Sequence, residues 1–411
     1  MFALPLDNTL DPSSEYTSFG FALHSNLLSR TLLNYRHVAG TRGNELLPDL
    51  AESLPEISDD GLTYTFTLDD AAGFGPPLKR DITSDDVAYA FERLATPRTG
   101  AGYSFYYESA IEGMAEFADG ASDEIAGIET PDEDTIVFHL LRPTGDFLYR
   151  LAMPATAPIP EEIARCFPEG EGYGRHLVSS GPYMIEGADV HFGSSCRKLD
   201  PFAGFEPAEH LYLVRNPAFA PGQDDLRIRE SLPDRFEFVA GSNEEEILEH
   251  LEDGRSDVAS GTPSFETLRR YASVPRLRRN LHVEAGDQLW YLAMNLVIPP
   301  FDDIHVRRAV NFVIDKDSLV RAWGGPLQGH VARHVLPDSM IGGRLDDFHP
   351  YPSRDNAGDL VRAKAEMRRS RYDSNRDGLC DRPACRGVVH IGRDVTPWSS
   401  LSLVIEASLH K

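Results

Sequence analysis

The sequence lacks an uninterrupted run of about 18 apolar residues, the length that a helix needs to cross the hydrocarbon core of a bilayer. It therefore predicts no membrane-spanning helix. The first residues, MFALPLDNTLDP, also lack a basic segment followed by an apolar stretch, which is the pattern of a secretory signal peptide. We therefore find no signal peptide in these residues.

Motifs that carry catalytic chemistry are missing as well. The sequence contains no G-x-S-x-G nucleophile turn, no H-E-x-x-H helix, no Walker A loop and no G-x-G-x-x-G after a strand pattern. Adjacent acids at 59–60, 85–86 and 302–303 stand at turns and helix starts, where capping explains them better than acid–base catalysis. The sequence therefore predicts a protein that is not an enzyme.

Basic residues are scarce relative to acidic ones. The chain has 40 Lys and Arg against 65 Asp and Glu, a formal net charge of −25 at pH 7. This balance argues against a nucleic-acid partner, which would need a basic face, and mildly favours cationic or zwitterionic ligands. By itself, such acidity more often serves solubility alone. A chain of 411 residues, 41% of them hydrophobic, is long enough for about two to four domains.

Cysteine is rare, and the four cysteines fall into two local pairs. Cys166 and Cys196 are 30 residues apart, and Cys380 and Cys385 are 5 apart. An even count with local pairing is compatible with two disulfides in an oxidising compartment, and four reduced thiols are the alternative. The second pair has neither a thioredoxin-type spacing nor a histidine at zinc-ligand spacing.

The patterns that are present alternate between strand and helix, which is typical of an α/β fold. Apolar residues alternate with threonines over 62–68, after an Asp-Asp-Gly turn signal. Thr83 begins a helix with Asp86 at the capping-box position. Residues 236–261 predict a strand, a helix capped by Asn243 and a second strand.

The most informative segment is 289–323, with the sequence LWYLAMNLVIPPFDDIHVRRAVNFVIDKDSLVRAW. We expect a strand that brings Trp290, Tyr291 and Asn295 close together, followed by a proline break. Two capped helices should follow, the first starting after the acids at 302–303.

This segment closely resembles the extracellular substrate-binding proteins of ABC importers, in the oligopeptide, dipeptide and nickel-binding family. The segments LPDLAESLPEISDDGLTYTFTL with ITSDDVAYAFERL, and SSGPYMI, resemble the same family. The resemblance implies an α/β fold of the type II periplasmic-binding-protein kind, with two main lobes and an extra subdomain. The implied first lobe is 1–45 with 179–285, the extra subdomain is 46–178, and the second lobe is 286–411.

The resemblance also implies a function. It is the capture of a peptide or similar small solute outside the cytoplasm and its delivery to the membrane subunits of an ABC importer, by a monomer without a cofactor. Export is implied too, with a lipoprotein anchor that this chain does not include, and export favours the two disulfides. Family members usually continue beyond the last residues, LSLVIEASLHK, so we expect a second lobe that is truncated at its C-terminus.

The turn before the first helix contributes to the ligand cleft in this family, and leucines at near-helical spacing from Leu23 to Leu33 predict that helix here. Peptide binding needs aromatic walls and hydrogen-bond partners for buried amides. The implied ligand-binding residues are Tyr16, Thr17, Ser18, Phe19, Trp290, Tyr291 and Asn295. A weaker set is Tyr103, Tyr106 and Tyr107; for Tyr106 and Tyr107, core or surface packing is the better interpretation.

One loop predicts a metal site without any resemblance to this family. Oxygen ligands stand at positions 1, 3, 5, 7 and 9, as in a calcium-binding loop, and a glycine at position 6 allows the sharp turn. The predicted ligands are Asp373, Asn375, Asp377, the carbonyl of Leu379, and Asp381. Position 12 is Ala384 instead of the usual glutamate, so a structural Ca²⁺ and a polar turn closed by the two cysteines are equally favoured.

Two other classes of protein stay open at this point. A secreted α/β hydrolase would need a nucleophile with a base, and the sequence offers no recognisable pair. A calcium-dependent interaction or adhesion module would rest on the loop at 373–381. Within the solute-binding class, nickel, haem and sugar ligands are alternatives to a peptide.

Overall fold

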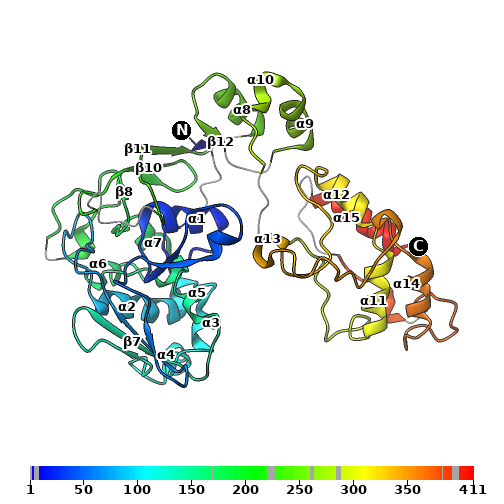
Figure 1. Cartoon of the computed structure of the whole chain (residues 1–411), viewed down its shortest axis with the longest axis horizontal. Helices are drawn as coiled ribbons and strands as arrows, with labels where there is room; N and C mark the ends of the chain where they lie inside the picture. Colours follow the sequence, from blue (N-terminus) through cyan, green and yellow to red (C-terminus); the bar gives the residue numbers. More distant parts are fainter. Residues whose placement is uncertain are drawn as a thin grey trace. The chain divides into compact units, whose positions relative to one another are not determined.

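The protein is described here by a computed structural model, which places residues 2–3, 9–168, 170–193, 195–219, 227–241, 243–259, 263–283, 288–381, 383–390 and 398–411. Contacts divide the chain into two compact units (Figure 1). Unit 1 is Met1–Gly261 and unit 2 is Thr262–Lys411. Each unit is described by itself.

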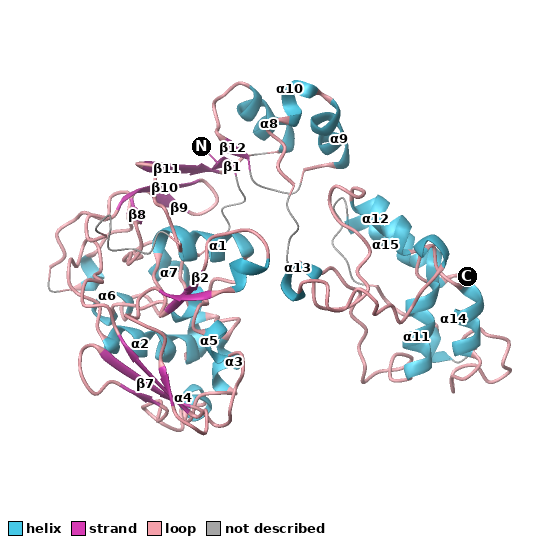
Figure 2. Ribbon diagram, in the orientation of Figure 1, coloured by secondary structure: helices cyan, strands magenta, loops and turns pink. Residues whose placement is uncertain are grey.

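Unit 1 contains a mixed sheet with the strand order β12, β1, β11, β10, β8, in which β9 also pairs with β10 (Figure 2). The strands are β1 (Phe2–Ala3), β8 (Tyr183–Ile185), β9 (Phe205–Glu206), β10 (His210–Arg215), β11 (Arg235–Val239) and β12 (Val258–Ala259). Strand β1 runs parallel to both β11 and β12, and β10 is antiparallel to its neighbours. Strand β1, from the start of the chain, therefore lies between β11 and β12, the two strands of the predicted strand–helix–strand unit.

A second, antiparallel sheet of unit 1 has the order β4, β5, β7, β6. Its strands are β4 (Glu56–Ile57), β5 (Thr63–Thr67), β6 (Ile128–Glu129) and β7 (Thr135–His139), and a separate pair is β2 (Leu33–Tyr35) with β3 (Leu46–Pro48). The predicted turn at 59–61 joins β4 to β5, and the alternation in β5 buries Tyr64 and Phe66. Both predictions are confirmed.

Helix α2 (Ser84–Ala95) belongs to an apolar core that includes residues of both sheets of unit 1. Its capping box is confirmed, since the Thr83 N–H donates to Asp86 Oδ2 at 2.9 Å. Phe91 of this helix meets Phe138 of β7 with 5.2 Å between ring centroids. The same core continues to Phe238 of β11. This core includes residues on both sides of the expected subdomain boundaries at 45/46 and 178/179. The division into first lobe and extra subdomain therefore stays a prediction.

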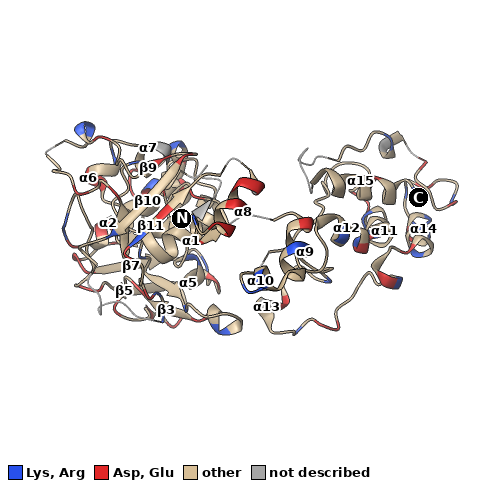
Figure 3. Ribbon diagram, turned by 90° about the horizontal axis from the view of Figure 1, so that it is seen from above, with Lys and Arg blue, Asp and Glu red and all other residues tan. Residues whose placement is uncertain are grey.

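The other helices of unit 1 are short. They are α1 (Ser18–Leu23), η1 (His24–Leu28), η2 (Thr41–Asn44), η3 (Pro97–Thr99), α3 (Ser104–Glu108), α4 (Met114–Ala118), α5 (Phe147–Arg150), η4 (Pro154–Thr156), α6 (Glu161–Ala164), α7 (Gly170–Gly174), η5 (Cys196–Lys198) and α8 (Glu244–Glu252). Helix α8 is capped by Asn243, as predicted, and its acidic residues stand out in Figure 3.

The predicted helix from Leu23 to Leu33 is wrong in its second half. The helical backbone ends at Leu28, and Leu33 begins strand β2. Ser29 is already extended, with φ −133° and ψ 152°. The Leu28 carbonyl accepts hydrogen bonds from the loop at 180–181 instead of from the next helical turn. A partner far away in the sequence therefore ends this helix.

The described residues of unit 2 form helices and loops without a strand. The helices are α9 (Phe265–Ser273), α10 (Pro275–Arg278), α11 (Ile304–Val313), α12 (Lys316–Trp323), α13 (Asp338–Ile341), η6 (Arg354–Asn356), α14 (Leu360–Met367), η7 (Pro383–Cys385) and α15 (Trp398–Leu409). The predicted caps are confirmed: Asp303 accepts from the His305 N–H at 2.8 Å, and Asp315 from the Ser318 N–H at 2.9 Å. Helices α11 and α14 enclose a small core of Val306, Ala309, Ala363, Met367 and Tyr372.

The predicted strand at 289–295 is wrong. Residues 288–295 have no regular secondary structure. A strand needs a neighbour to satisfy its backbone groups, and the described part of unit 2 offers no strand to pair with. Helices α9 and α10 fall in unit 2, whereas the expected lobe boundary at 285/286 assigned them to the first lobe. The lobe boundaries themselves stay predictions.

Both predicted disulfides are present, Cys166–Cys196 in unit 1 and Cys380–Cys385 in unit 2. Among the described residues, no helix is both long enough and apolar enough to span a membrane.

Candidate functional site

The turn before α1 is built around the carboxylate of Glu15. Glu15 Oε1 accepts hydrogen bonds from both the N–H and the hydroxyl of Thr17, each at 2.7 Å. Thr17 in turn caps α1, since its Oγ1 accepts from the Gly20 N–H at 3.0 Å. A Cβ at position 20 would lie 1.9 Å from Glu15 Cδ, so a larger residue there would displace the Glu15 side chain. Thr17 and Ser18 are thus fixed at the start of the helix.

Four aromatic residues of unit 1, here called the aromatic patch, gather beside this turn. The patch is Tyr16, Tyr103, Phe105 and Tyr106. Tyr16 is 65% exposed and stacks on Tyr103 with 4.7 Å between ring centroids. Partial burial and the nearby Tyr16 raise the pKa of Tyr103, so this phenol stays protonated and can donate a hydrogen bond. The predicted Tyr16 and two of the three weaker candidates are therefore brought together.

Two other predicted residues lie in or against the core. Tyr107 is completely buried and donates to the Arg150 carbonyl at 2.8 Å, so packing was the correct interpretation. Phe19 is partly buried and meets Phe238 edge-on, with 5.8 Å between ring centroids.

Glu15 is a residue that the sequence analysis missed. It is only 7% exposed, and its Oε2 is buried without a hydrogen-bond partner. A buried acceptor without a partner is unfavourable unless a water or a ligand satisfies it. Nothing in the stretch Ser13 to Tyr16 signals this, because the burial comes from residues distant in the sequence.

Other buried charges of unit 1 serve structure. Asp49 is bound by Arg229, whose Nη1 donates to Oδ1 at 2.9 Å, and by Arg30, whose Nε donates to Oδ1 at 3.1 Å. Burial alone would raise the pKa of Asp49, but the two guanidinium groups outweigh it and hold this pKa below its usual range. Asp11 pairs with Arg93, yet burial prevails and raises the pKa of Asp11. Such paired charges fix neighbouring segments to each other.

In unit 2, the predicted Trp290 joins two tryptophans that the sequence analysis did not single out as partners. Trp290, Trp323 and Trp398 lie 4.8 to 5.1 Å apart between ring centroids and are all the tryptophans of the sequence. Trp290 is still 56% exposed and Tyr291 is 79% exposed. Asn295 is exposed, and its Oδ1 accepts from the Val297 N–H at 3.2 Å. Because the expected strand is absent, Tyr291 and Asn295 do not form a cluster of side chains with Trp290 in the described structure.

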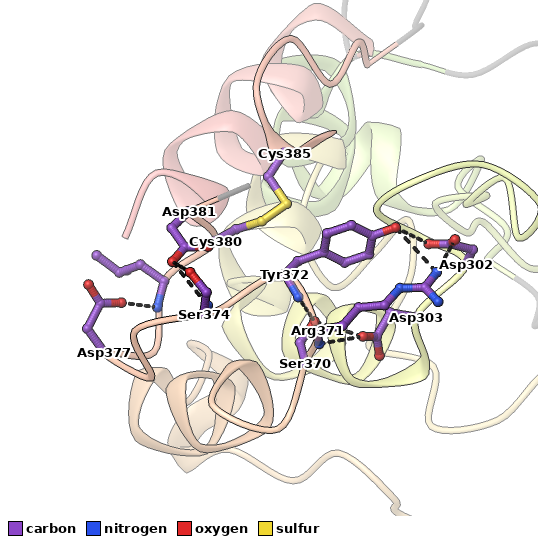
Figure 4. The surroundings of a disulfide bond; sticks show 11 residues. Asp302, Asp303, Ser370, Arg371, Tyr372, Ser374, Asp377, Cys380, Asp381 and Cys385 are labelled. Carbon is purple, nitrogen blue, oxygen red and sulfur yellow. Dashed lines mark hydrogen bonds and ion pairs between the residues drawn. A yellow bond between two sulfur atoms is a disulfide. The ribbon is translucent and has the colours of Figure 1, made fainter. Parts of the chain in front are cut away.

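The predicted metal loop is closed on itself by hydrogen bonds. Its ligand oxygens accept from backbone N–H groups two to seven residues away, and Asp381 lies beside Ser374 (Figure 4). Within the part of the chain that is described, no three His, Cys, Asp or Glu side chains form a ready metal site. A calcium site would also use the amide oxygen of Asn375 and the carbonyl of Leu379.

Comparison with known proteins shows the family of the chain. The family model described as bacterial extracellular solute-binding proteins, family 5 Middle, matches residues 45–391. The chain belongs to this family. The predicted family and the α/β fold of type II periplasmic-binding-protein kind are confirmed.

Individual members of the family are similar to this chain over much of its length. It is 25% identical over 323 residues to the dipeptide-binding protein of Escherichia coli (strain K12). This match covers 75% of this chain and 52% of that protein. It is 26% identical over 318 residues to heme-binding protein A of Haemophilus influenzae, covering 75% and 51%. A solved structure of clavulanic acid biosynthesis oligopeptide binding protein 2 matches all of this chain and 68% of that one, with 30% identity and a TM-score of 0.79. The chain thus spans about half the length of these curated relatives.

Proposed function

We propose that the protein binds a peptide outside the cytoplasm and delivers it to an ABC importer, without making or breaking a bond. The observation that carries this proposal is the family match over residues 45–391. The names of two similar proteins, a dipeptide-binding and an oligopeptide-binding protein, favour a peptide over other solutes. Heme-binding protein A makes haem the second candidate. The comparisons lend no support to a hydrolase or an adhesion module.

The aromatic patch supplies the groups that a peptide needs. The exposed ring of Tyr16 offers a flat apolar wall, and the Tyr103 hydroxyl is a donor for a peptide carbonyl. The unpartnered Oε2 of Glu15 can accept from a ligand amide or ammonium group. The net charge of −25 agrees with cationic or zwitterionic cargo. Release to the importer follows if the peptide binds one conformation of the protein more tightly than another.

The proposal extends to location and partners. Two disulfides suit an oxidising compartment, and the named relatives of the family act as binding proteins. We place the protein outside the cytoplasm as a monomer that docks on the membrane subunits of an importer. A lipoprotein anchor belongs to the same proposal for the full-length protein.

The first experiment identifies the cargo. The protein is purified under native conditions, denatured, and the released small molecules are identified by mass spectrometry. Peptides should be recovered, and a defined peptide from that set should then bind in calorimetry. Recovery of haem or a sugar, with no heat from any peptide, would overturn the peptide assignment while leaving solute binding intact.

A variant tests the aromatic patch. Tyr16→Ala should weaken binding of the recovered peptide roughly tenfold, because truncation of a contacting aromatic residue costs about 1–2 kcal/mol. Leu54→Ala, which removes another exposed apolar side chain of unit 1, is the matched control and should bind like the parent. Equal affinities for the two variants would remove Tyr16 from the proposed site.

A further inference from the structure

The buried carboxylate of Asp373 indicates a second kind of site in unit 2. Asp373 is only 3% exposed, and its Oδ2 accepts a hydrogen bond from the Gly378 N–H at 2.8 Å. Its Oδ1 is buried and has no hydrogen-bond partner. A buried carboxylate oxygen without a partner is costly unless an ion or a water satisfies it. Because the other oxygen accepts from the Gly378 N–H, the carboxylate lies against the turn of the loop.

Side-chain oxygens at alternate positions line the same loop. Asn375 Oδ1 accepts from the Asp377 N–H at 3.0 Å, and Asp377 Oδ1 accepts from the Leu379 N–H at 2.8 Å. These bonds fold the backbone into successive tight turns, so that oxygen-bearing side chains follow one another along the loop. Gly378 makes the sharp turn with φ +92°, and a Cβ there would lie 2.7 Å from Lys364 Cβ. Position 378 therefore has to be glycine.

We propose that this loop binds one calcium ion. The ligands are Oδ1 of Asp373, the side-chain oxygens of Asn375 and Asp377, the carbonyl of Leu379, and Asp381. Calcium takes about six to eight oxygen ligands in a flexible arrangement, so waters complete the shell where Ala384 replaces the usual glutamate. Magnesium fits poorly, because it demands a near-ideal octahedron and gives up its own waters reluctantly.

Binding requires side-chain movements. The described residues hold no ready cluster of three acidic or histidine side chains, so the carboxylates have to turn inward. One bond to be given up is that from Asn375 Nδ2 to Asp377 Oδ2, at 3.0 Å. Both side chains are exposed, so both can rotate at little cost.

The rest of the loop is held rigidly, which keeps the ligands near their binding geometry. At its start, the Tyr372 hydroxyl donates to Asp302 at 2.9 Å, and the Ser370 hydroxyl donates to Asp303 at 2.8 Å (Figure 4). Tyr372 is also part of the small core of unit 2. At its end, the Cys380–Cys385 disulfide packs against this core. Fixed ends lower the entropy that the loop loses when it binds the ion.

Calorimetry on the intact, chelator-treated protein tests the proposal. Calcium chloride should bind at one site with a Kd of about 10⁻⁴ to 10⁻³ M, the range of extracellular calcium modules, and magnesium chloride should give no comparable heat. Absence of heat at millimolar calcium would overturn the proposal. Equal binding of magnesium would overturn the assignment to calcium.

Variants locate the site. Asp377→Ala, at an exposed position, and Asp373→Asn should each weaken calcium binding at least about tenfold, because each removes a charged ligand. Asp347→Ala, which removes an exposed acid elsewhere in unit 2, should bind like the parent. Unchanged circular dichroism shows that the variants fold. If both loop variants bound calcium as tightly as the parent, the loop would not be the site. Peptide binding by these variants is measured separately, so the two proposals stand or fall independently.

Discussion

His24 is completely buried in unit 1, so its titration is coupled to folding. Its Nδ1 lies 2.9 Å from Ser29 Oγ, and its Nε2 has no hydrogen-bond partner. Burial lowers the pKa of His24 to about 4. In the unfolded chain the pKa is near 6.5, so between these two values the unfolded state binds a proton that the folded state does not. The free energy of unfolding therefore falls as the pH falls through this window.

We predict that His24→Gln removes this pH dependence. Protonation of His24 in the unfolded state accounts for about 3 kcal/mol of destabilisation at pH 4 relative to pH 7. Urea unfolding followed by circular dichroism should give a shallower fall for the variant between pH 6.5 and 4. His410→Gln, at a side chain that is 76% exposed, is the control and should keep the parent slope. A parallel fall for parent and His24→Gln would refute the assignment.

At the scale of single residues, local signals were predictable and distant ones were not. Thr83, Asn243 and Asp303 were found from the sequence because a cap and its partner lie within three residues of each other. Glu15 was missed because residues far away in the sequence bury it. Trp398 was missed because its ring contacts Trp290, which is also far away in the sequence. No period or turn signal encodes such contacts.

Asp303 shows how one side chain serves two elements. It caps α11 through the His305 N–H, and its Oδ2 accepts from the Ser370 hydroxyl and from the Arg371 N–H at 3.1 Å. Burial alone would raise the pKa of Asp303, but these hydrogen bonds outweigh it and lower the pKa. The side chain thus stays ionised and ties the start of α11 to the segment after α14.

We predict that Asp303→Ala destabilises unit 2 by about 2 kcal/mol, from the lost cap and the lost hydrogen bonds to Ser370 and Arg371. Amide exchange of α11 should speed up accordingly, as measured by mass spectrometry. The matched control is Asp317→Ala in the first turn of α12, which loses only an exposed pair with Arg321 and should change exchange very little. Equal effects of the two variants would mean that Asp303 is an ordinary surface acid.

Elements with a complete local pattern were predicted well. Strand β5 alternates strictly, and α2 combines a capping box with an apolar stripe, so both follow from the sequence alone. The segment 289–295 has the residues of a strand but finds no partner strand among the described residues of unit 2. Whether such a segment forms a strand depends on a neighbour, which its own residues do not determine.

At the scale of the whole molecule, the two units differ in how much apolar surface they bury. The core of unit 1 joins two sheets and α2 and includes completely buried rings such as Phe66, Phe91 and Phe138. Among the described residues of unit 2, the core cluster between α11, α14 and the metal loop has five buried residues. The free energy gained from burial grows with the apolar area removed from water. Unit 2 should therefore be the less stable of the two.

Hydrogen exchange of the native protein tests this difference within one sample. Amides of α11 and α14 should exchange through openings of lower free energy than amides of β5 and α2, which serve as the internal reference. If the calcium proposal holds, millimolar calcium should slow exchange in 373–381 and in α11, since an ion bound only by the folded loop stabilises it by mass action. The amides of β5 and α2 should not respond. Equal protection of both units without calcium would show that the small core of unit 2 is not its only source of stability.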